Sequence, residues 1–363
     1  MAKKTKICVG VIFGGRSGEH EVSLVSATSV IREMPKDKYT VKEIGISKTG
    51  KWYMGKGLVE KFKKGGLKGL KSESFEKAFV GCDIAFPVLH GPFGEDGTIQ
   101  GLFEMTGIPY VGCGVLASSV CMDKVVLKEI LDNCGISVVP YVAFTRDEWL
   151  KNSKKFISKI KKSIGLPCFV KPANMGSSVG ISKVKKDSSS ELFNAINFAF
   201  KFDSKVLTEK AVNAREIECA VLGNEDARAA ELGEILVGGE FYDYHDKYVN
   251  GKSKTQIPVK NLSSKKKKEI SEMCLRAFKA AGCSGLSRAD CFLDKKTGKV
   301  YLNEINTLPG FTSISMYPKM WQASGVSYPK LIDVLIKLGL KRYAEKQKNE
   351  ISFDSGSNWF QTP

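Results

Sequence analysis

The first 122 residues alternate short apolar runs with longer amphipathic stretches, and this pattern constrains the fold more than any other feature. The runs "ICVGVIF", "VKEIGIS" and "CDIAFPVL" have the length of strands, and helices are predicted from about 19 to 33 and at "TIQGLFEMTG". Strands that alternate with helices form a parallel sheet with helices on its faces. We therefore predict an α/β domain with a parallel sheet at residues 1–122, and a mobile Gly/Lys-rich excursion at 55–75.

The remainder of the chain mixes helices and strands without this regular alternation. With 363 residues, the chain is too long for one ordinary core. A helix at "MDKVVLKEILDNCG" opens a second block, which we place at 123–213. A third block at 214–349 contains strands, a helix at 264–281 and a last helix from about 328 to 346. Residues 350–363 are predicted to be a polar tail.

Composition excludes several classes of protein. No apolar run approaches the roughly 18 residues of a membrane span, so we expect a cytoplasmic protein that does not bind membranes. The ten cysteines form no C-x-x-C pair and the three histidines are far apart, which argues against a zinc site and against a disulfide framework. The formal charge of +17 leaves three interpretations open: nucleic-acid binding, a lysine-rich solvated surface, or attraction of polyanionic small substrates.

A pliable loop follows a predicted buried strand at "VKPANMGSSVG", residues 170–180. The loop is not a Walker sequence. The first block, whose sheet would suit a nicotinamide-dependent oxidoreductase, carries "FGGRSGE" in place of the G-x-G-x-x-G fingerprint, which argues against that class. Glycines let backbone N–H groups approach an anion, the serines add hydroxyl donors, and Lys171 adds a positive charge. The loop is therefore either a phosphate cradle or a flexible surface loop.

Two neighbouring strands in the third block carry polar residues two positions apart. "SRADCFLD" supplies Arg288 and Asp290, and "YLNEIN" supplies Glu304 and Asn306. Residues two apart project from one face of a strand, and the turn "DKKTGKV" makes these strands a hairpin. Three oxygen ligands suit magnesium, so the sequence predicts a metal site at Asp290, Glu304 and Asn306. A solvated sheet face with paired charges is the alternative.

Two further loops carry candidate site residues. "LHGPFGEDGTIQG" places His90 and two acids at the end of a strand, where ligands bind in open α/β sheets. A structural histidine with satisfied hydrogen bonds is the alternative. "TLPGFTSIS" follows Asn306, and its turn could direct an N–H group at an oxyanion beside Arg288. An ordinary turn is the alternative there.

Together these segments resemble the D-alanine–D-alanine ligases of the ATP-grasp superfamily. The resemblance is carried by "FGGRSGEHEVSL", "HGPFGEDGTIQG", "MDK", "VKPANMGSSVG", "FYDYHDKY", "GLSRADCFLDKKTGKVYLNEINTLPG" and "PGFTSISMYP", in this order over about residues 5–347. It implies a mixed α/β fold of three ATP-grasp domains, the first of them Rossmann-like. It also implies that ATP phosphorylates one D-alanine, whose acyl phosphate is attacked by the amine of a second D-alanine to give a peptidoglycan precursor.

The resemblance assigns roles to residues at matching positions. The catalytic residues that it implies are Glu19, Ser177, Tyr248, Arg288, Gly310 and Ser315. The substrate-binding residues are Glu19, His90, Arg288, Gly310, Ser315 and Met316. The ATP-binding residues are Lys124, Lys171, Ser177, Ser178, Glu209, Lys210, Val212, Glu216 and Lys247. Two Mg²⁺ ions, with Mn²⁺ as a substitute, are expected at the predicted metal site.

Three points stay open beside this resemblance. Glu19 could instead be a helix-start carboxylate that interacts with the helix dipole. Tyr248 and Met316 favour D-alanine as the second substrate, but D-serine and D-lactate ligases are close siblings. The resemblance also implies a homodimer. It implies no nucleic-acid partner, although a nucleic-acid-binding protein remains the alternative from another class.

Overall fold

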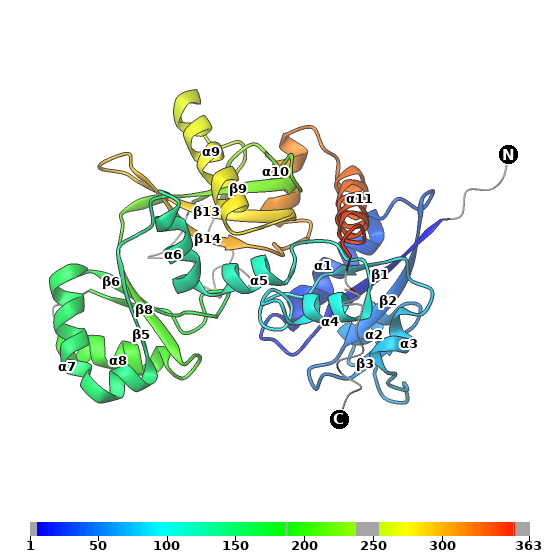
Figure 1. Cartoon of the computed structure of the whole chain (residues 1–363), viewed down its shortest axis with the longest axis horizontal. Coiled ribbons are helices and arrows are strands. Elements are labelled where there is room, and N and C mark those ends of the chain that lie inside the picture. The colour runs from blue at the N-terminus through cyan, green and yellow to red at the C-terminus, as the bar shows by residue number, and fades with distance from the viewer. Residues whose placement is uncertain (1–5, 186–187, 237–253, 351, 353–363) are drawn as a thin grey trace, which may run out of the picture.

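The computed structural model describes residues 6–185, 188–236, 254–350 and 352. It is a mixed α/β structure with three sheets, in agreement with the predicted fold class (Figure 1). No helix in these described ranges is long and apolar enough to cross a membrane. The three domain boundaries given above stay predictions.

The first sheet has the strand order β3-β2-β1-β4, in which β1 is parallel to β2 and β4, and β3 is antiparallel to β2. Its strands are β1 (Ile7–Gly14), β2 (Tyr39–Ile46), β3 (Trp52–Met54) and β4 (Ile84–Pro87). Its helices are α1 (His20–Glu33), α2 (Leu58–Lys63), α3 (Phe75–Phe79) and α4 (Thr98–Thr106). The predicted strands and helices of this block are therefore present, and the structure adds β3 at the sheet edge as well as α2 and α3.

The second sheet is antiparallel, with the order β5-β8-β6-β7, and forms the green lobe on the left of Figure 1. Its strands are β5 (Tyr141–Thr145), β6 (Cys168–Pro172), β7 (Ser182–Val184) and β8 (Lys205–Lys210). Helices α7 (Arg146–Ser163) and α8 (Ser189–Ala199) pack on it, while α5 (Val115–Met122) and α6 (Lys124–Asn133) link this lobe to the first sheet.

The third sheet is also antiparallel, with the order β12-β11-β9-β13-β14, and β10 pairs with β9. Its strands are β9 (Ala214–Gly223), β10 (Arg228–Ala229), β11 (Gly233–Leu236), β12 (Lys254–Gln256), β13 (Gly285–Asp294) and β14 (Val300–Asn306). The helices of this part are α9 (Ser264–Ala280), α10 (Met316–Ala323) and α11 (Tyr328–Lys346). This sheet lies between the other two parts in Figure 1.

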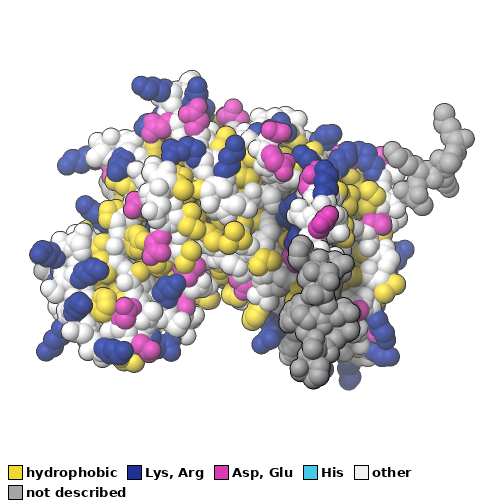
Figure 2. Space-filling model, viewed as in Figure 1, with side chains coloured by type: hydrophobic (Ala, Val, Ile, Leu, Met, Phe, Trp, Pro, Cys, Tyr) yellow, Lys and Arg dark blue, Asp and Glu magenta, His cyan; other side chains and the backbone are white. Residues whose placement is uncertain are grey.

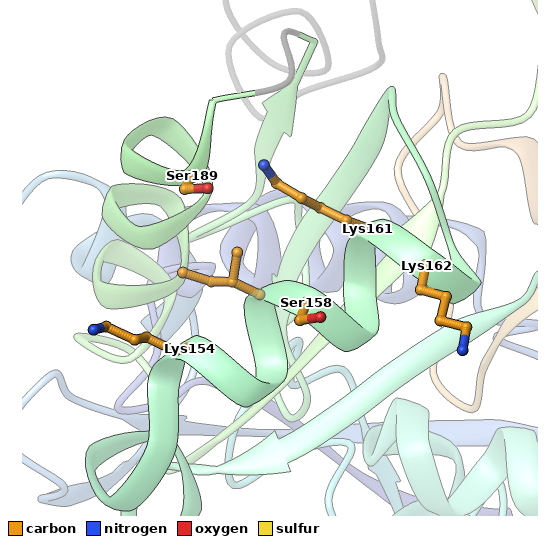
Figure 3. A pocket seen from close by; sticks show the side chains of 6 residues that line it. Lys154, Ser158, Lys161, Lys162 and Ser189 are labelled. Atoms are coloured by element: carbon orange, nitrogen blue, oxygen red, sulfur yellow. The ribbon is translucent and has the colours of Figure 1, made fainter.

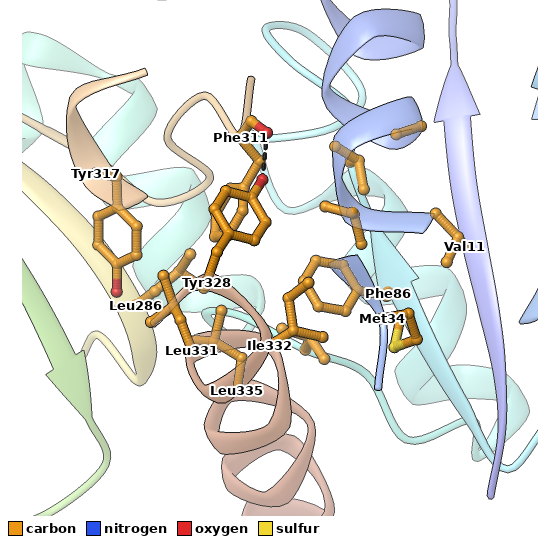
Figure 4. Packing of buried hydrophobic residues seen from close by; sticks show 14 of the residues in the cluster. Val11, Met34, Phe86, Leu286, Phe311, Tyr317, Tyr328, Leu331, Ile332 and Leu335 are labelled. Carbon is orange, nitrogen blue, oxygen red and sulfur yellow. Dashed lines mark hydrogen bonds between the residues drawn. The ribbon is translucent and has the colours of Figure 1, made fainter. Parts of the chain in front are cut away.

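The core around α11 joins the first and third sheets (Figure 4). Leu331, Ile332 and Leu335 of α11 are fully buried there. The Tyr328 hydroxyl donates a hydrogen bond to the carbonyl of Phe311 in the loop after β14. The last helix therefore fixes the loop that follows the predicted metal strands.

The Gly/Lys-rich segment 55–75 is more regular than predicted. It contains α2, whose Leu58, Val59 and Phe62 side chains are buried. Phe62 packs edge-on against Phe13 of β1. Three apolar side chains at helical spacing outweighed the glycines, and the prediction of a mobile excursion missed this helix.

Candidate active site

The polar residues of β13 and β14 lie side by side in the third sheet. Asp290 is opposite Glu304 on β14, and Arg288 is opposite Asn306. On its other side, Asp290 is opposite Glu218 of β9. Directly paired residues of antiparallel strands share a face of the sheet. Glu218, Asp290 and Glu304 therefore form what we call the carboxylate row.

Arg288 is the cation of this row. Its guanidinium donates two hydrogen bonds to the Asp290 carboxylate, from Nε to Oδ1 at 2.7 Å and from Nη2 to Oδ2 at 2.6 Å. Its Nε also lies 3.3 Å from Oε2 of Glu218. Burial alone would lower the pKa of Arg288, but the charges of Asp290 and Glu218 outweigh it and hold the pKa well above its usual range.

A β-bulge brings the two strands into this arrangement. Asp290 pairs with Glu304, but the next residue, Cys291, pairs with Leu302. Asn303 is therefore the extra residue on β14. A bulge re-aims the side chains that follow it, and here Glu304 and Asn306 come to face Asp290 and Arg288.

The side chains of Asp290, Glu304 and Asn306 offer a donor set that fits a hard divalent cation. Asp290 and Glu304 face each other, and the Asn306 amide lies against Asp290 with Nδ2 at 3.0 Å from Oδ2. All of these donors can be oxygens, as Mg²⁺ prefers. Among the described residues, no group of three or more His, Cys, Asp and Glu side chains converges on a metal position. Two carboxylates plus an amide therefore remain the candidate ligands.

A second charged group lies on β6, β8 and α6. Glu209 of β8 is 3% exposed and forms ion pairs with Lys171 of β6 and, at 2.6 Å, with Lys128 of α6. Lys124 lies one turn before Lys128 and donates a 2.7 Å hydrogen bond to the carbonyl of Met175. Met175 belongs to the loop at residues 170–180, which we call the serine loop. We call Lys124, Lys128, Lys171 and Glu209 the lysine cluster.

Charge and burial shift the pKa of two members of the lysine cluster. Burial would raise the pKa of Glu209, but the charges of Lys128 and Lys171 overcome this effect and lower the pKa to about 2. Burial lowers the pKa of Lys124, and the charge of Glu304 opposes that shift. The Lys124 ammonium lies 3.9 Å from the Glu304 carboxylate, so the cluster and the row meet at this contact.

Asp123 fixes the start of helix α6, which carries Lys124 and Lys128. The Asp123 carboxylate accepts hydrogen bonds from the backbone N–H groups of Val125 and Val126 and caps the helix. Asp123 also pairs with Lys205 of β8 at 2.6 Å. The helix start is thereby tied to the sheet that carries Lys171 and Glu209.

The serine loop contacts the start of α1. Ser177 donates a hydrogen bond to the Glu19 carboxylate. Glu19 is the N-cap residue of α1, but its side chain makes no capping hydrogen bond. Glu19 therefore joins the loop to the start of α1, and its interaction with the helix dipole stays the alternative.

The backbone around Glu19 allows this close approach. Gly91 has a φ of +74°, and a Cβ there would lie 2.8 Å from Oε2 of Glu19. Glycine alone fits both conditions. Ser177 and Ser178 have φ values of +50° and +60°, which are uncommon for residues with a side chain and mark a specialised loop.

His90 and Glu95 tie this region to the loop after β14. The His90 ring nitrogens lie 3.0 Å from Ser26 Oγ and 3.2 Å from the carbonyl of Leu308, as expected of a structural histidine. Burial lowers the pKa of His90, while the charge of Glu19 opposes this shift. Glu95 accepts hydrogen bonds from the N–H groups of Gly91 and Leu308, at 2.8 and 3.2 Å.

The turn at Gly310 packs closely against the start of α10. A Cβ at Gly310 would lie 2.8 Å from Oγ of Ser315, and this hydroxyl accepts a hydrogen bond from the Thr312 N–H at 3.0 Å. Ser315 thus holds the turn in shape. Met316 is 6% exposed and packs into the core, with its methyl group against Gly233.

Comparison with known proteins identifies the family. Residues 8–113 match the family model "D-ala D-ala ligase N-terminus", and residues 130–337 match "D-ala D-ala ligase C-terminus". The chain belongs to the D-alanine–D-alanine ligase family. The family resemblance given by the sequence motifs is thereby confirmed.

Relatives agree over almost the whole length. A D-alanine–D-alanine ligase of Acetivibrio thermocellus is 48% identical, with 93% of this chain and 97% of the relative covered. The structure of the D-alanine–D-alanine ligase from Coxiella burnetii has a TM-score of 0.81 and 34% identity, covering 94% of this chain and 98% of that one. The VanG D-Ala:D-Ser ligase from Enterococcus faecalis has a TM-score of 0.79 and 37% identity, covering 92% and 100%.

Three residues of this ligase-family site were not assigned from the sequence. Lys128 follows Lys124 by four residues on a predicted helix, so helical spacing could have found it. Glu218 follows Glu216 by two residues on a predicted strand, which is the same signal that revealed Asp290. Glu95 lies in a quoted motif, but nothing in the sequence indicates that it joins two loops.

Other predicted site residues lie at the edge of this arrangement or outside the description. Lys210 is exposed at the end of β8, Val212 follows it, and Glu216 on β9 is opposite Phe292. Lys247 and Tyr248 lie outside the described residues. Their predicted roles in the ligase family therefore stay predictions.

Positively charged side chains are spread over the surface of the protein that Figure 2 shows. On the face drawn in Figure 2, Lys and Arg side chains are distributed over all parts of the molecule. A basic hollow beside α7, lined by Lys154, Ser158, Lys161, Lys162 and Ser189, lies in the left lobe and contains none of the predicted site residues (Figure 3).

Proposed function

We propose that this protein joins two D-alanine molecules to D-alanyl-D-alanine, at the expense of ATP, and so supplies a peptidoglycan precursor. The observation that carries this proposal is the 3.9 Å contact of Lys124 with Glu304, where the lysine cluster meets the carboxylate row. Lysines suit the phosphates of ATP, and carboxylates suit the cations that accompany them. Family membership gives the reaction.

The proposed reaction has two steps that balance. A carboxylate oxygen of the first D-alanine attacks the γ-phosphorus of ATP, and ADP leaves with the electron pair of the broken P–O bond. The amine of the second D-alanine then attacks the acyl carbon, phosphate leaves, and the amine loses a proton. A carboxylate is a poor electrophile, and phosphorylation turns its oxygen into a leaving group.

The residues of this chain bind and orient the reactants in that scheme. Glu19 holds the ammonium group of the first D-alanine, and Lys124 and Lys171 hold phosphates. Arg288 and the N–H of Gly310 stabilise the tetrahedral intermediate, whose oxygen carries a developing negative charge. Ser177 brings the loop over the site and excludes water, which would hydrolyse the acyl phosphate.

Divalent cations would be held by Asp290, Glu304 and Asn306. The ions would neutralise phosphate charge during phosphoryl transfer. The donor chemistry of these three side chains supports this assignment, as described above.

The choice of second substrate is tested by an amino-acid panel. Purified protein is incubated with ATP and Mg²⁺, and ADP is measured with D-alanine alone or with D-alanine plus D-serine or D-lactate. We expect D-alanine alone to give the full rate. Faster ADP release in the presence of D-serine or D-lactate would favour a sibling ligase, since a D-Ala:D-Ser ligase is among the similar structures. No ADP release above background in any arm would reject the ligase proposal.

We also propose a homodimer that acts in the cytoplasm, where its nucleotide substrate is available. Met105 of α4 and Leu116 of α5 are 90% and 70% exposed, which suits burial against a second copy. Light scattering after size exclusion should give twice the chain mass, and Leu116→Glu should shift it toward one chain. For the nucleic-acid alternative, retention on DNA-cellulose that falls steeply with salt would be the supporting result.

A further inference from the structure

Asp290 is required for two tasks in the proposed function. In the structure, both of its carboxylate oxygens accept hydrogen bonds from Arg288, and Oδ2 also accepts one from Asn306. As a proposed cation ligand, the same carboxylate must turn at least one oxygen toward a metal ion. Arg288 would then lose at least one of its two hydrogen bonds to Asp290.

A buried guanidinium that loses its counter-ion is unstable. The Arg288 side chain is 18% exposed, so water replaces little of the lost interaction. The catalytic role proposed for Arg288 also requires that its orientation be kept. Another carboxylate must therefore hold Arg288 when Asp290 turns away.

Glu218 meets the requirements for this task. It is opposite Asp290 on the neighbouring strand β9, its Oε2 lies 3.3 Å from Nε of Arg288, and its side chain is 8% exposed. It is the most buried member of the row, because Asp290 and Glu304 are 17% and 28% exposed. Strand β9 lies between β11 and β13 in the sheet, so the position of its backbone is fixed.

We propose that Glu218 is a positioning residue, which retains Arg288 by its carboxylate when Asp290 turns to a divalent cation. This inference rests on the proposed function, because it assumes that Asp290 binds the cation. In this proposal Glu218 is not itself a cation ligand. Its contact is with the arginine.

The first test is metal binding measured without turnover. Mn²⁺ binding in the presence of ADP is followed by electron paramagnetic resonance for the full-length protein. In Glu218→Gln, Arg288 has Asp290 as its remaining carboxylate on this side and competes with the metal, so we expect about tenfold weaker Mn²⁺ binding. Glu218→Asp keeps the charge and should stay within about threefold of the unchanged protein. Equal affinity of Glu218→Gln and the unchanged protein would overturn the inference.

A matched control separates positioning from the general loss of a buried ion pair. Glu234 of β11 is 6% exposed and pairs with Arg215 through two contacts of 2.7 Å, in the same sheet but outside the row. Glu234→Gln should leave Mn²⁺ binding within about twofold. Weakening as large as in Glu218→Gln would show a structural effect alone and would overturn the inference.

A double-mutant cycle decides whether Glu218 acts through Arg288. In an Arg288→Ala background, Asp290 has no arginine to release, so adding Glu218→Gln should change Mn²⁺ affinity by less than about threefold. A further tenfold loss would make Glu218 a direct ligand and reject the positioning role. In turnover, Glu218→Gln should lower kcat by more than it raises the KM for D-alanine.

Failure of the underlying proposal has a different signature. Asp290→Asn should abolish most Mn²⁺ binding if the row is a metal site. If Asp290→Asn leaves Mn²⁺ binding intact, then the proposed metal site is wrong. If Asp290→Asn abolishes binding but Glu218→Gln does not weaken it, then only the role of Glu218 is wrong.

Discussion

The carboxylate row and the lysine cluster have opposite excesses of charge. In the row, three carboxylates surround one arginine, whereas in the cluster three lysines surround one glutamate. The two groups belong to different sheets and meet at the contact of Lys124 with Glu304. Neither group is neutral by itself.

This difference indicates what each region can accept. A group with excess negative charge stabilises cations, and a group with excess positive charge stabilises phosphate. The single opposite charge in each group fixes the geometry of the others: Arg288 bridges Glu218 and Asp290, and Glu209 bridges Lys128 and Lys171. The comparison predicts that substitutions in the two regions affect different kinetic constants.

The largest effect is expected for Arg288→Ala. Loss of a group that stabilises charge in the transition state typically lowers kcat by about 10²- to 10³-fold. The KM for ATP should change by less than about threefold, because Arg288 belongs to the row and not to the cluster. Steady-state ADP release at varied ATP measures both constants, and equilibrium binding of ADP measures nucleotide affinity separately.

The comparison would break if Arg288→Ala weakened nucleotide binding as strongly as it lowered kcat. Arg215→Ala is a control, since Arg215 also pairs with a buried glutamate of the third sheet. It should reduce stability but leave kcat within about threefold.

Lys171→Met should raise the KM for ATP. A hydrogen bond to a charged group contributes about 1.5–3 kcal/mol, so we expect the KM for ATP to rise about 10- to 100-fold. Lys183→Met is a matched control, because both ammonium groups lie over the Phe169 ring, at 5.9 Å for Lys171 and 5.6 Å for Lys183. A larger change in Lys183→Met than in Lys171→Met would contradict the assignment of the cluster.

Much of this comparison was predictable from the sequence, but unevenly. Spacing of two residues predicted that Arg288 and Asp290 share a face, and the hairpin turn placed β14 beside β13. The extra residue Asn303 could not be predicted, because a bulge depends on how both strands pack. Because of this bulge, the alternation of side chains along β14 does not by itself determine which face of the sheet Glu304 occupies.

The lysine cluster was less accessible to sequence reasoning. The pattern placed Lys171 at a strand end, but Glu209 was assigned to ATP binding by resemblance and its two ion pairs were not foreseen. Contacts between α6 and the second sheet depend on tertiary packing, and no repeating pattern of residues in the sequence indicates such contacts. The overall α/β class was predictable because it depends on periods of 2 and 3.6 residues.

Ser177→Ala tests the link that closes the site over both regions. It removes the hydroxyl that donates to Glu19, so the first D-alanine should bind more weakly. We expect a rise of about five- to tenfold in the KM for D-alanine, corresponding to about 1 kcal/mol. Ser178→Ala should instead raise the KM for ATP. Identical effects of both substitutions on both constants would mean that the loop acts only as a flexible cover.

The smallest effect concerns pH. Burial, and then the charge of Glu19, raise the pKa of Glu95 to about 8. A carboxyl whose pKa is higher in the folded than in the unfolded protein stabilises the fold below its ordinary pKa, because the folded state binds more protons. This contribution is lost as the pH rises from about 4.5 toward 8.

Glu95→Gln should therefore flatten the decrease of unfolding free energy between pH 5 and pH 8, as measured by urea denaturation. The lysine cluster supplies the opposite sign as a control: Glu209 has a pKa lowered to about 2, so its contribution is present above about pH 4.5 and is lost only as the pH falls toward 2. Lys128→Met should then raise the pH at which acid unfolding begins and leave the range from pH 5 to 8 unchanged. A Glu95→Gln profile that kept the slope of the unchanged protein would show that Glu95 is not the titrating group.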